Sequence, residues 1–289
     1  MSVRSSGRWL VLAVALSQSA CAQDGSNGTG SRINMEGATE IGRTINGHTY
    51  TNAPVEVKLG PNTFRIPANY LDSQIAPWPG EGVTLVIEWP DMKSTPPGAR
   101  ADPRTNDFRK EITALVDYID RVPIETLLAV HASTDRVTVP GSIESRDPRD
   151  RLDLRMAQPE VMGLTPYAID EMKMAAFSKE YEAREGKPPI RNPAFEEDWY
   201  VARDAKGQLT TFIKCDNHKF LPNDGVRLEG RQIVDDMVGG VRQIASCTQR
   251  FVDIENKLSF SVDYYRVYLK DWQRIQEVFL DLMRQSKAR

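Results

Sequence analysis

The alternation of apolar and polar residues at 258–264 constrains the fold of this chain more than any other sequence feature. The segment reads Leu-Ser-Phe-Ser-Val-Asp-Tyr, so an apolar side chain occupies every second position. Because successive side chains of a strand point to opposite faces, the pattern predicts a β-strand with one buried face and one face in water. Further along, apolar residues recur at three- and four-residue steps, at Tyr268, Trp272, Ile275, Phe279, Leu282 and Met283. This spacing predicts an amphipathic C-terminal helix that packs on the sheet.

Short strand-like runs are found in both halves of the chain. Runs rich in β-branched and aromatic residues and bounded by turn residues predict strands. These runs are 55–59, 64–66, 83–89, 111–119, 199–201, 209–215 and 244–251. Helices are predicted over 123–132 and over 165–185, where Thr165-Pro166 resembles a helix start and Gly186 a helix end. The expected fold class is therefore α+β, with two lobes of short antiparallel strands and packed helices.

A charged segment divides the chain into two predicted lobes. Residues 145–151 include a proline and contain no apolar residue, which is typical of a boundary. The length of 289 residues allows one or two domains. We expect a signal peptide at 1–22, a flexible tether at 23–45, an N-terminal α+β lobe at 46–145 and a C-terminal α+β lobe at 152–289. The sequence leaves open whether the lobes are separate domains or share one continuous sheet.

The first residues have the pattern of a secretory signal peptide. Arg4 and Arg8 precede an apolar run at 9–16, and small residues follow that run. The run has about eight apolar residues, whereas a membrane-spanning helix needs about 20. The sequence therefore predicts an exported chain with no later membrane span.

Two cleavage sites compete at the end of this signal. The tripeptide that ends at Cys21 resembles a bacterial lipoprotein signal, in which the cysteine thiol carries the lipid, although Gln18 stands where an apolar residue is usual. The alternative is ordinary cleavage after Ala22, at an Ala-x-Ala site. The Gly- and Ser-rich stretch 24–31 suits a flexible tether between an anchor and a folded domain.

The cysteines that remain after Cys21 form an even pair. In an exported protein Cys215 and Cys247 are expected to form a disulfide, since each lies in a strand-like run. A metal site is the alternative, because His218 follows Cys215 by three residues. No other histidine lies nearby in the sequence, so the metal site is disfavoured.

Motifs of known catalytic sites are missing from the sequence. It has no G-x-S-x-G elbow, no H-E-x-x-H, no Walker loop and no paired C-x-x-C. The histidines His48, His131 and His218 are scattered, and the adjacent acids at 196–198 and 235–236 are typical of a solvated surface. We therefore predict no enzyme, no cofactor and no metal. The formal charge of −3 also argues against a nucleic-acid-binding protein.

Several short motifs carry a resemblance to a known family. The first is the Phe-x-Ile-Pro-x-Asn-Tyr segment at 64–70, followed by Glu-Trp-Pro-Asp-Met at 88–92. The second half adds the segments 212–215, 247–251 and 264–272. Together they resemble a family of envelope immunity proteins that accompany type VI secretion lipase effectors in Gram-negative bacteria. The resemblance extends over most of residues 46–285.

This resemblance implies a binding role in the periplasm. Such a protein binds a cognate lipase or phospholipase toxin and blocks its active site or its access to lipid. The implied location is the periplasm, at the outer membrane if Cys21 is acylated, and nucleic acid is not an expected partner. The alternatives are an envelope lipoprotein with a structural or secretion-apparatus assembly role, and a secreted hydrolase of unrecognised type.

An acidic cluster beside an aromatic residue is the candidate contact surface for the toxin. Glu196, Glu197, Asp198 and Trp199 are consecutive, and interfaces are enriched in aromatic anchors. The acidic net charge is expected to steer the chain toward a basic surface of the effector.

Overall fold

The computed structural model describes residues 39–72, 77–78, 80–133, 141–237 and 243–288. The predicted signal peptide, Cys21 and the first part of the predicted tether lie outside these residues. None of the described helices is long and apolar enough to cross a bilayer.

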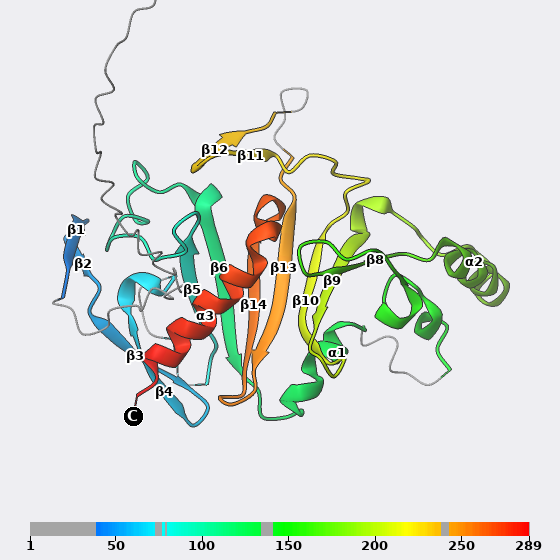
Figure 1. Cartoon of the computed structure of the whole chain (residues 1–289), viewed down its shortest axis with the longest axis horizontal. Helices are drawn as coiled ribbons and strands as arrows, with labels where there is room; N and C mark the ends of the chain where they lie inside the picture. The colour runs from blue at the N-terminus through cyan, green and yellow to red at the C-terminus, as the bar shows by residue number, and fades with distance from the viewer. Residues whose placement is uncertain (1–38, 73–76, 79, 134–140, 238–242, 289) are drawn as a thin grey trace, which may run out of the picture. The chain divides into compact units, whose positions relative to one another are not determined.

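The largest element of the fold is an eight-stranded antiparallel sheet with the strand order β5-β6-β14-β13-β10-β9-β8-β7 (Figure 1). Its strands are β5 (Val83–Glu88), β6 (Glu111–Tyr118), β7 (Met156–Ala157), β8 (Thr165–Ala168), β9 (Glu197–Arg203), β10 (Leu209–Asp216), β13 (Ser246–Asp253) and β14 (Leu258–Tyr265). Three two-stranded sheets accompany it: β1 (Ile41–Ile45) with β2 (His48–Thr51), β3 (Pro54–Leu59) with β4 (Asn62–Pro67), and β11 (Val226–Glu229) with β12 (Gln232–Asp235).

Three α-helices lie in the described part of the chain. They are α1 (Leu127–His131), α2 (Glu171–Glu185) and α3 (Trp272–Ser286). Short 3₁₀ turns lie at Ala68–Tyr70, Phe108–Lys110, Ile124–Thr126, Glu144–Arg146, Leu152–Leu154, Pro193–Phe195 and Arg266–Asp271. The predicted α+β fold class is confirmed.

The two predicted lobes share one sheet. Strand β6 precedes the charged segment 145–151 and pairs with β14, which follows that segment, so that Val116 lies opposite Phe260. Strands from both halves are therefore hydrogen-bonded neighbours at the middle of the sheet. This pairing answers the question that the sequence left open, since the sheet continues across the predicted boundary.

The C-terminal helix covers one face of the sheet, as its spacing predicts. In β14 the side chains of Leu258, Phe260, Val262 and Tyr264 are buried, and the alternate positions are partly or fully exposed. Helix α3 lies across this face (Figure 1) and buries its apolar stripe, which includes Ile275, Phe279, Leu282 and Met283. Each large apolar side chain buried in this way contributes about 1.5–3 kcal/mol, so this contact is a main source of stability.

A buried polar network fixes where α3 begins on the sheet. Gln249 is 0% exposed, accepts a hydrogen bond from the Tyr264 hydroxyl at 2.9 Å and donates to the Trp272 carbonyl at 3.2 Å. The Thr211 hydroxyl donates to the side chain of Gln276 at 2.8 Å. Because an unpaired buried polar group is costly, any shift of the first helical turn along the sheet is unfavourable.

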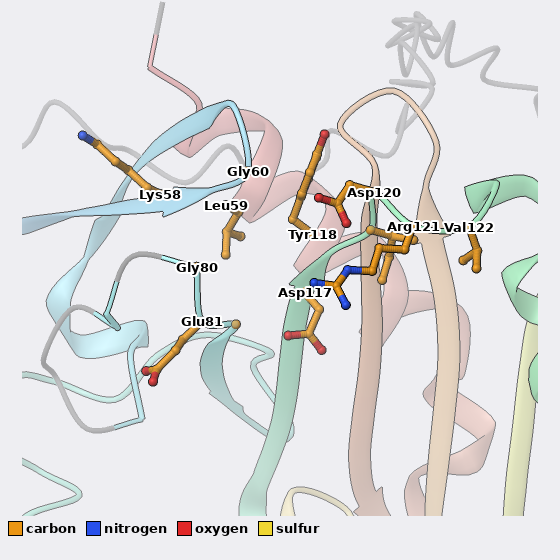
Figure 2. A pocket seen from close by; sticks show the side chains of 12 residues that line it. Lys58, Leu59, Gly60, Gly80, Glu81, Asp117, Tyr118, Asp120, Arg121 and Val122 are labelled. Atoms are coloured by element: carbon orange, nitrogen blue, oxygen red, sulfur yellow. The ribbon is translucent and has the colours of Figure 1, made fainter.

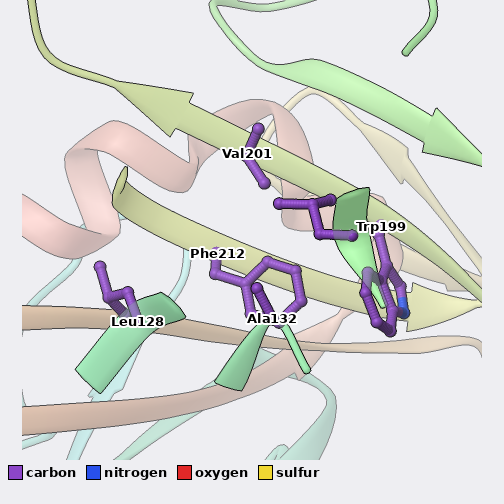
Figure 3. Close-up of a cluster of buried hydrophobic side chains, with 6 residues drawn as sticks. Leu128, Ala132, Trp199, Val201 and Phe212 are labelled. Carbon is purple, nitrogen blue, oxygen red and sulfur yellow. The ribbon is translucent and has the colours of Figure 1, made fainter. Parts of the chain in front are cut away.

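The opposite face of the sheet is covered at its β9–β10 end. Val201 lies opposite Phe212, and Trp199 packs edge-on against the Phe212 ring with centroids 5.1 Å apart. Figure 3 shows these side chains gathered with Leu128 and Ala132, which belong to α1 and the residue after it. This second cluster gives the sheet a packed layer on the face away from α3.

The predicted helix at 165–185 begins too early. Residues Thr165–Ala168 form strand β8, in which Pro166 lies opposite Tyr200 of β9. The helix begins after Asp170, whose carboxylate accepts hydrogen bonds from the backbone N–H groups of Met172 and Lys173. Its predicted end at Gly186 is confirmed by a left-handed φ of 73°. Proline lacks an N–H group, and its carbonyl accepts a hydrogen bond from the Gln158 N–H at 2.8 Å, so the residue is compatible with β8.

The remaining predicted strands agree with the structure. The runs at 55–66, 83–89, 111–119 and 199–215 form the strands β3 to β6 and the β9–β10 hairpin, and 258–264 forms β14. Cys215 of β10 lies opposite Cys247 of β13, and the two sulfur atoms are bonded. The expected disulfide therefore joins two central strands of the sheet.

Candidate partner-binding surface

Trp199 is a core residue. Its side chain is 1% exposed, and the guanidinium carbon of Arg155 lies 3.8 Å from the ring centroid. The indole N–H donates to the Glu197 carboxylate at 3.2 Å. Alternation along β9 places Trp199 on the face that packs against α1, so its ring is covered by the fold. Of the four residues predicted as a contact surface, this one is not available to a partner in this structure.

The three acids before Trp199 are already engaged by neighbouring groups. Glu196 accepts from the Arg191 side chain at 2.5 Å, and Glu197 lies 3.3 Å from the Lys214 ammonium. Asp198 accepts a hydrogen bond from the backbone N–H of His218 at 2.8 Å. The side chain of Glu197 is 44% exposed and Asp198 is partly exposed, so both remain accessible, whereas the side chain of Glu196 is only 9% exposed. A role for them in toxin binding stays a prediction.

Arg191 joins two elements next to this cluster. Its guanidinium donates to both carboxylate oxygens of Glu171 at the start of α2, at 2.7 and 2.8 Å, and also to Glu196 before β9. The hydrogen bonds from Arg191 hold the pKa of Glu171 below its usual value. The same contacts raise the pKa of Arg191, so both groups stay charged over the physiological range.

We call Arg191 and its two carboxylate partners, Glu171 and Glu196, the Arg191 clamp. Three strongly exposed apolar side chains are next to these residues in the sequence. Met172 is 83% exposed, Ile190 is 87% exposed and Phe195 is 84% exposed. Each is the direct neighbour of a clamp residue, namely Glu171, Arg191 or Glu196. We call Met172, Ile190 and Phe195 with the Arg191 clamp the Arg191 patch. Exposed apolar residues rimmed by charged groups are typical of interaction sites.

Sequence reasoning missed Phe195, the aromatic residue that this surface does expose. It lies in the 3₁₀ turn Pro193–Phe195, which is capped by Asn192 through a hydrogen bond from the Ala194 N–H at 3.0 Å. The Asn-Pro start of this turn is visible in the sequence and ends the preceding segment. The exposure of Phe195 is not visible there, because it depends on which neighbours the fold brings to the turn.

A separate pocket lies beside the end of β6 (Figure 2). It has a volume of about 460 Å³, and its charged lining residues are Lys58, Glu81, Asp117, Asp120 and Arg121. Burial raises the pKa of Asp117 above its ordinary value. No histidine, cysteine or serine is among the described residues that line this pocket. The lining therefore offers charge and shape and lacks the usual nucleophile–base pair of a catalytic site.

Close approach of two elements forms one wall of this pocket. Gly60 in the turn between β3 and β4 has a φ of 59°, and a Cβ atom there would lie 2.4 Å from the ring of Tyr118. Only glycine allows the turn to lie against this ring.

The structure keeps the three histidines on different elements. His48 lies on β2, His131 ends α1 and His218 follows β10. Burial and the charges of Arg250 and Lys214 lower the pKa of His131. Within the described ranges, no group of histidine, cysteine and acidic side chains has the arrangement of a metal site.

The fold is an α+β scaffold with a cross-strand disulfide and with three exposed apolar side chains beside Arg191 in the chain. No protein-family model and no curated protein matches the chain. A solved structure, that of Smlt3025, is similar to it with 63% sequence identity and a TM-score of 0.82. The match covers 87% of this chain and 100% of the other. Smlt3025 is described as an immunity protein of the Stenotrophomonas maltophilia type IV secretion system.

Identity at this level over the whole of Smlt3025 shows that the chain belongs to the same protein family. The predicted resemblance to immunity proteins is confirmed at this level. The relative belongs to a type IV secretion system, whereas the sequence motifs pointed to type VI, and the match contains no information on a lipase.

Proposed function

We propose that this chain is a non-enzymatic immunity protein that binds and neutralises a cognate toxin delivered by a secretion system. The observation that carries this proposal is the 63% identity to an immunity protein along its full length. Of the two secretion systems, type IV has the stronger support, because it is the system of the relative. The lipase activity of the toxin remains the prediction from the sequence motifs.

The architecture suits an inhibitor that binds without rearranging. The central strands β10 and β13 are joined by the Cys215–Cys247 disulfide, and both faces of the β9–β10 hairpin region are packed. A rigid scaffold lowers the ordering cost of association. Since inhibition by occlusion needs only a stable contact surface, the lack of a recognisable catalytic set is compatible with this role.

The Arg191 patch is our candidate for part of the toxin contact. It lies next to the predicted Glu196–Asp198 cluster and supplies the exposed aromatic anchor that Trp199 does not. Hot spots of protein interfaces are commonly aromatic or arginine residues surrounded by a rim that excludes water. Phe195 in the turn Pro193–Phe195 and Arg191 just before that turn provide both residue types.

The proposed compartment is the periplasm. It rests on the signal peptide predicted at residues 1–22 and on the disulfide, which is stable in an oxidising compartment. Attachment to the outer membrane through a lipid on Cys21 is part of the same proposal and depends on which cleavage site is used.

The test is capture of the toxin by the mature chain. Effectors secreted by the type IV and type VI systems of the producing strain would be passed over immobilised protein, and each retained effector assayed for toxicity and for phospholipase activity. We expect one toxin to be retained and to lose its activity at a stoichiometric ratio. The same amount of immobilised Phe195→Asp variant should retain less of the toxin.

Two other outcomes would change the proposal. Retention of secretion-apparatus subunits without a neutralised toxin would favour the assembly role. Retention of a toxin that is not a lipase would keep the immunity function and replace the predicted toxin class.

A further inference from the structure

A groove beside α1 combines positive charge with an apolar floor. It has a volume of about 670 Å³, within the range of about 300–1,000 Å³ for ligand-sized pockets. Its floor continues the cluster shown in Figure 3, through Ala132 and Leu152. Among the described lining residues are three arginines, namely Arg151, Arg155 and Arg203, and one acidic residue, Asp153.

Arg155 is a buried cation whose hydrogen bonds go to backbone carbonyls. It is 6% exposed, and its terminal N–H groups donate to the backbone carbonyls of Tyr167, Glu197 and Arg149 at 2.9 to 3.3 Å. Its Nε has no hydrogen-bond partner in the described part of the chain. Desolvation lowers the pKa of Arg155 to about 10, so the group still carries its charge at neutral pH.

The other two arginines differ in how far they are neutralised. Arg151 pairs with Asp153 through two hydrogen bonds, at 2.8 and 2.5 Å. Arg203 is exposed at the end of β9, and its side chain donates to the carbonyl of Gly207 at 2.9 Å. Among the described residues that line the groove there is thus one carboxylate for three guanidinium groups, on a chain whose formal net charge is −3. The groove is a local positive site on an acidic protein.

We propose that this groove, which we call the arginine groove, receives an acidic segment of the cognate toxin. A carboxylate of the toxin would lie against Arg203 and Arg151, and a neighbouring apolar side chain would cover the floor at Ala132 and Leu152. The planar fork of an arginine matches a carboxylate with two parallel hydrogen bonds. This inference rests on the proposed immunity function and names the chemistry of the partner surface.

A protein segment fits the groove better than an isolated small anion. Pockets for small molecules usually enclose 70–90% of the ligand surface, whereas this groove is open to solvent and has the exposed Arg203 at its rim. An open site with a charged rim and an apolar floor has the composition of a protein interface. The acidic net charge of the whole chain does not cancel a contact of this kind. In about 0.1 M salt, interactions between exposed charges more than about 10 Å apart are largely screened.

The test measures binding of the toxin that the wild-type chain neutralises. Calorimetry would compare the wild type with Arg203→Glu, which changes an exposed residue and leaves the buried Arg155 in place. We expect Arg203→Glu to raise the Kd at least about 30-fold, and Arg203→Lys to recover part of that loss. The matched control is Arg231→Glu in the β11–β12 hairpin, where the arginine side chain is 69% exposed. Its Kd should stay within about twofold of the wild type.

A charge swap separates a direct contact from an indirect effect. Aspartates and glutamates of the toxin surface would be changed to arginine one at a time, and each variant titrated with the Arg203→Glu chain. Recovery of tight binding by one of them places that carboxylate in the groove. If Arg203→Glu binds as tightly as the wild type while the wild type still neutralises the toxin, the groove proposal is wrong and the immunity function stands. If the wild type neutralises no effector, both proposals fail.

Discussion

At the scale of single residues, two aromatic side chains four positions apart have opposite environments. Trp199 is 1% exposed and Phe195 is 84% exposed. The sequence predicted Trp199 as part of a contact surface because it directly follows an acidic cluster. A sequence shows which residues are adjacent in the chain and does not show which of them are buried. The alternation of β9 turns this residue into the core, and the Asn-Pro turn before the strand leaves Phe195 outside. Burial is decided here by packing against α1, which lies about 70 residues earlier in the chain.

This difference gives a paired prediction for Trp199 and Phe195. Trp199→Ala should lower the free energy of unfolding by about 3–5 kcal/mol, since a buried aromatic is lost and a cavity forms. Phe195→Ala should change it by less than about 0.5 kcal/mol and should weaken toxin binding at least about tenfold. Urea unfolding and calorimetry measure the two effects. A stability loss of several kcal/mol in Phe195→Ala would show that its exposure in this structure is wrong.

A second prediction concerns the pH dependence of stability and His131. Burial, followed by the positive charges of Arg250 and Lys214, lowers its pKa in the folded protein. The unfolded chain therefore binds a proton more readily, so stability is fully present above the unfolded pKa of about 6.5 and falls as the pH drops below it. We expect the wild type to lose stability between pH 7.5 and 5.5.

The matched comparison for this effect is His131→Asn, which has no titrating group at this position. Its free energy of unfolding should fall less over the same pH interval, measured by urea titration at each pH. Equal losses in both proteins would show that other groups cause the pH dependence.

At the scale of elements, local patterns predicted those strands whose burial alternates along one segment. Residues 258–264 alternate because one face of β14 meets α3, and the same reasoning located β3 and β4. Strands β5 and β6 were predicted instead from runs rich in apolar, β-branched and aromatic residues. Strand β8 escaped prediction because Thr165-Pro166 has the residue types of a helix start, and only pairing with β9 makes the segment a strand. That partner lies more than 30 residues away, so the competing helix signal was the stronger one in the local sequence.

The two long helices are predicted to differ in local stability. Both have 15 residues, but α2 buries only Met174 and Phe177, whereas α3 buries six residues. Local opening requires little free energy where few apolar contacts are lost. We therefore expect backbone amides in α2 to exchange with solvent at least about 100-fold faster than those in α3, as measured by hydrogen–deuterium exchange.

A core substitution in α2 tests the cause of that difference. Phe177→Ala removes a contact of the small cluster formed with Ile143 and Met174. It should speed exchange in α2 further and leave α3 unchanged. Equal protection of both helices in the wild type would contradict the packing difference described here.

At the scale of the whole molecule, the sequence predicted the fold class and left open the continuity of the sheet. Each half contains strands of its own, and the charged segment 145–151 is a reasonable boundary by composition. The pairing of β6 with β14 joins residues about 150 positions apart, and no local pattern encodes such a register. The same holds for the arginine groove, whose lining comes from α1 and the residues after it, from residues 151–155, and from strands β7 to β10. A site assembled from distant segments is visible only after the chain has folded.

An immunity protein must be in the compartment from which its toxin attacks the cell. If the toxin attacks from the periplasm, deletion of residues 2–22 should abolish protection of cells that export the toxin, while the full chain protects them. The Cys21→Ser variant separates lipid anchoring from export. The full chain should incorporate labelled palmitate and fractionate with membranes. The Cys21→Ser variant should be unlabelled, and soluble after cleavage at Ala22. A wild-type chain that is unlabelled and begins at Gln23 would establish the ordinary signal peptide and exclude the lipoprotein. Protection by the chain that lacks residues 2–22 would place the toxin in the cytoplasm and overturn the periplasmic proposal, even with the immunity function intact.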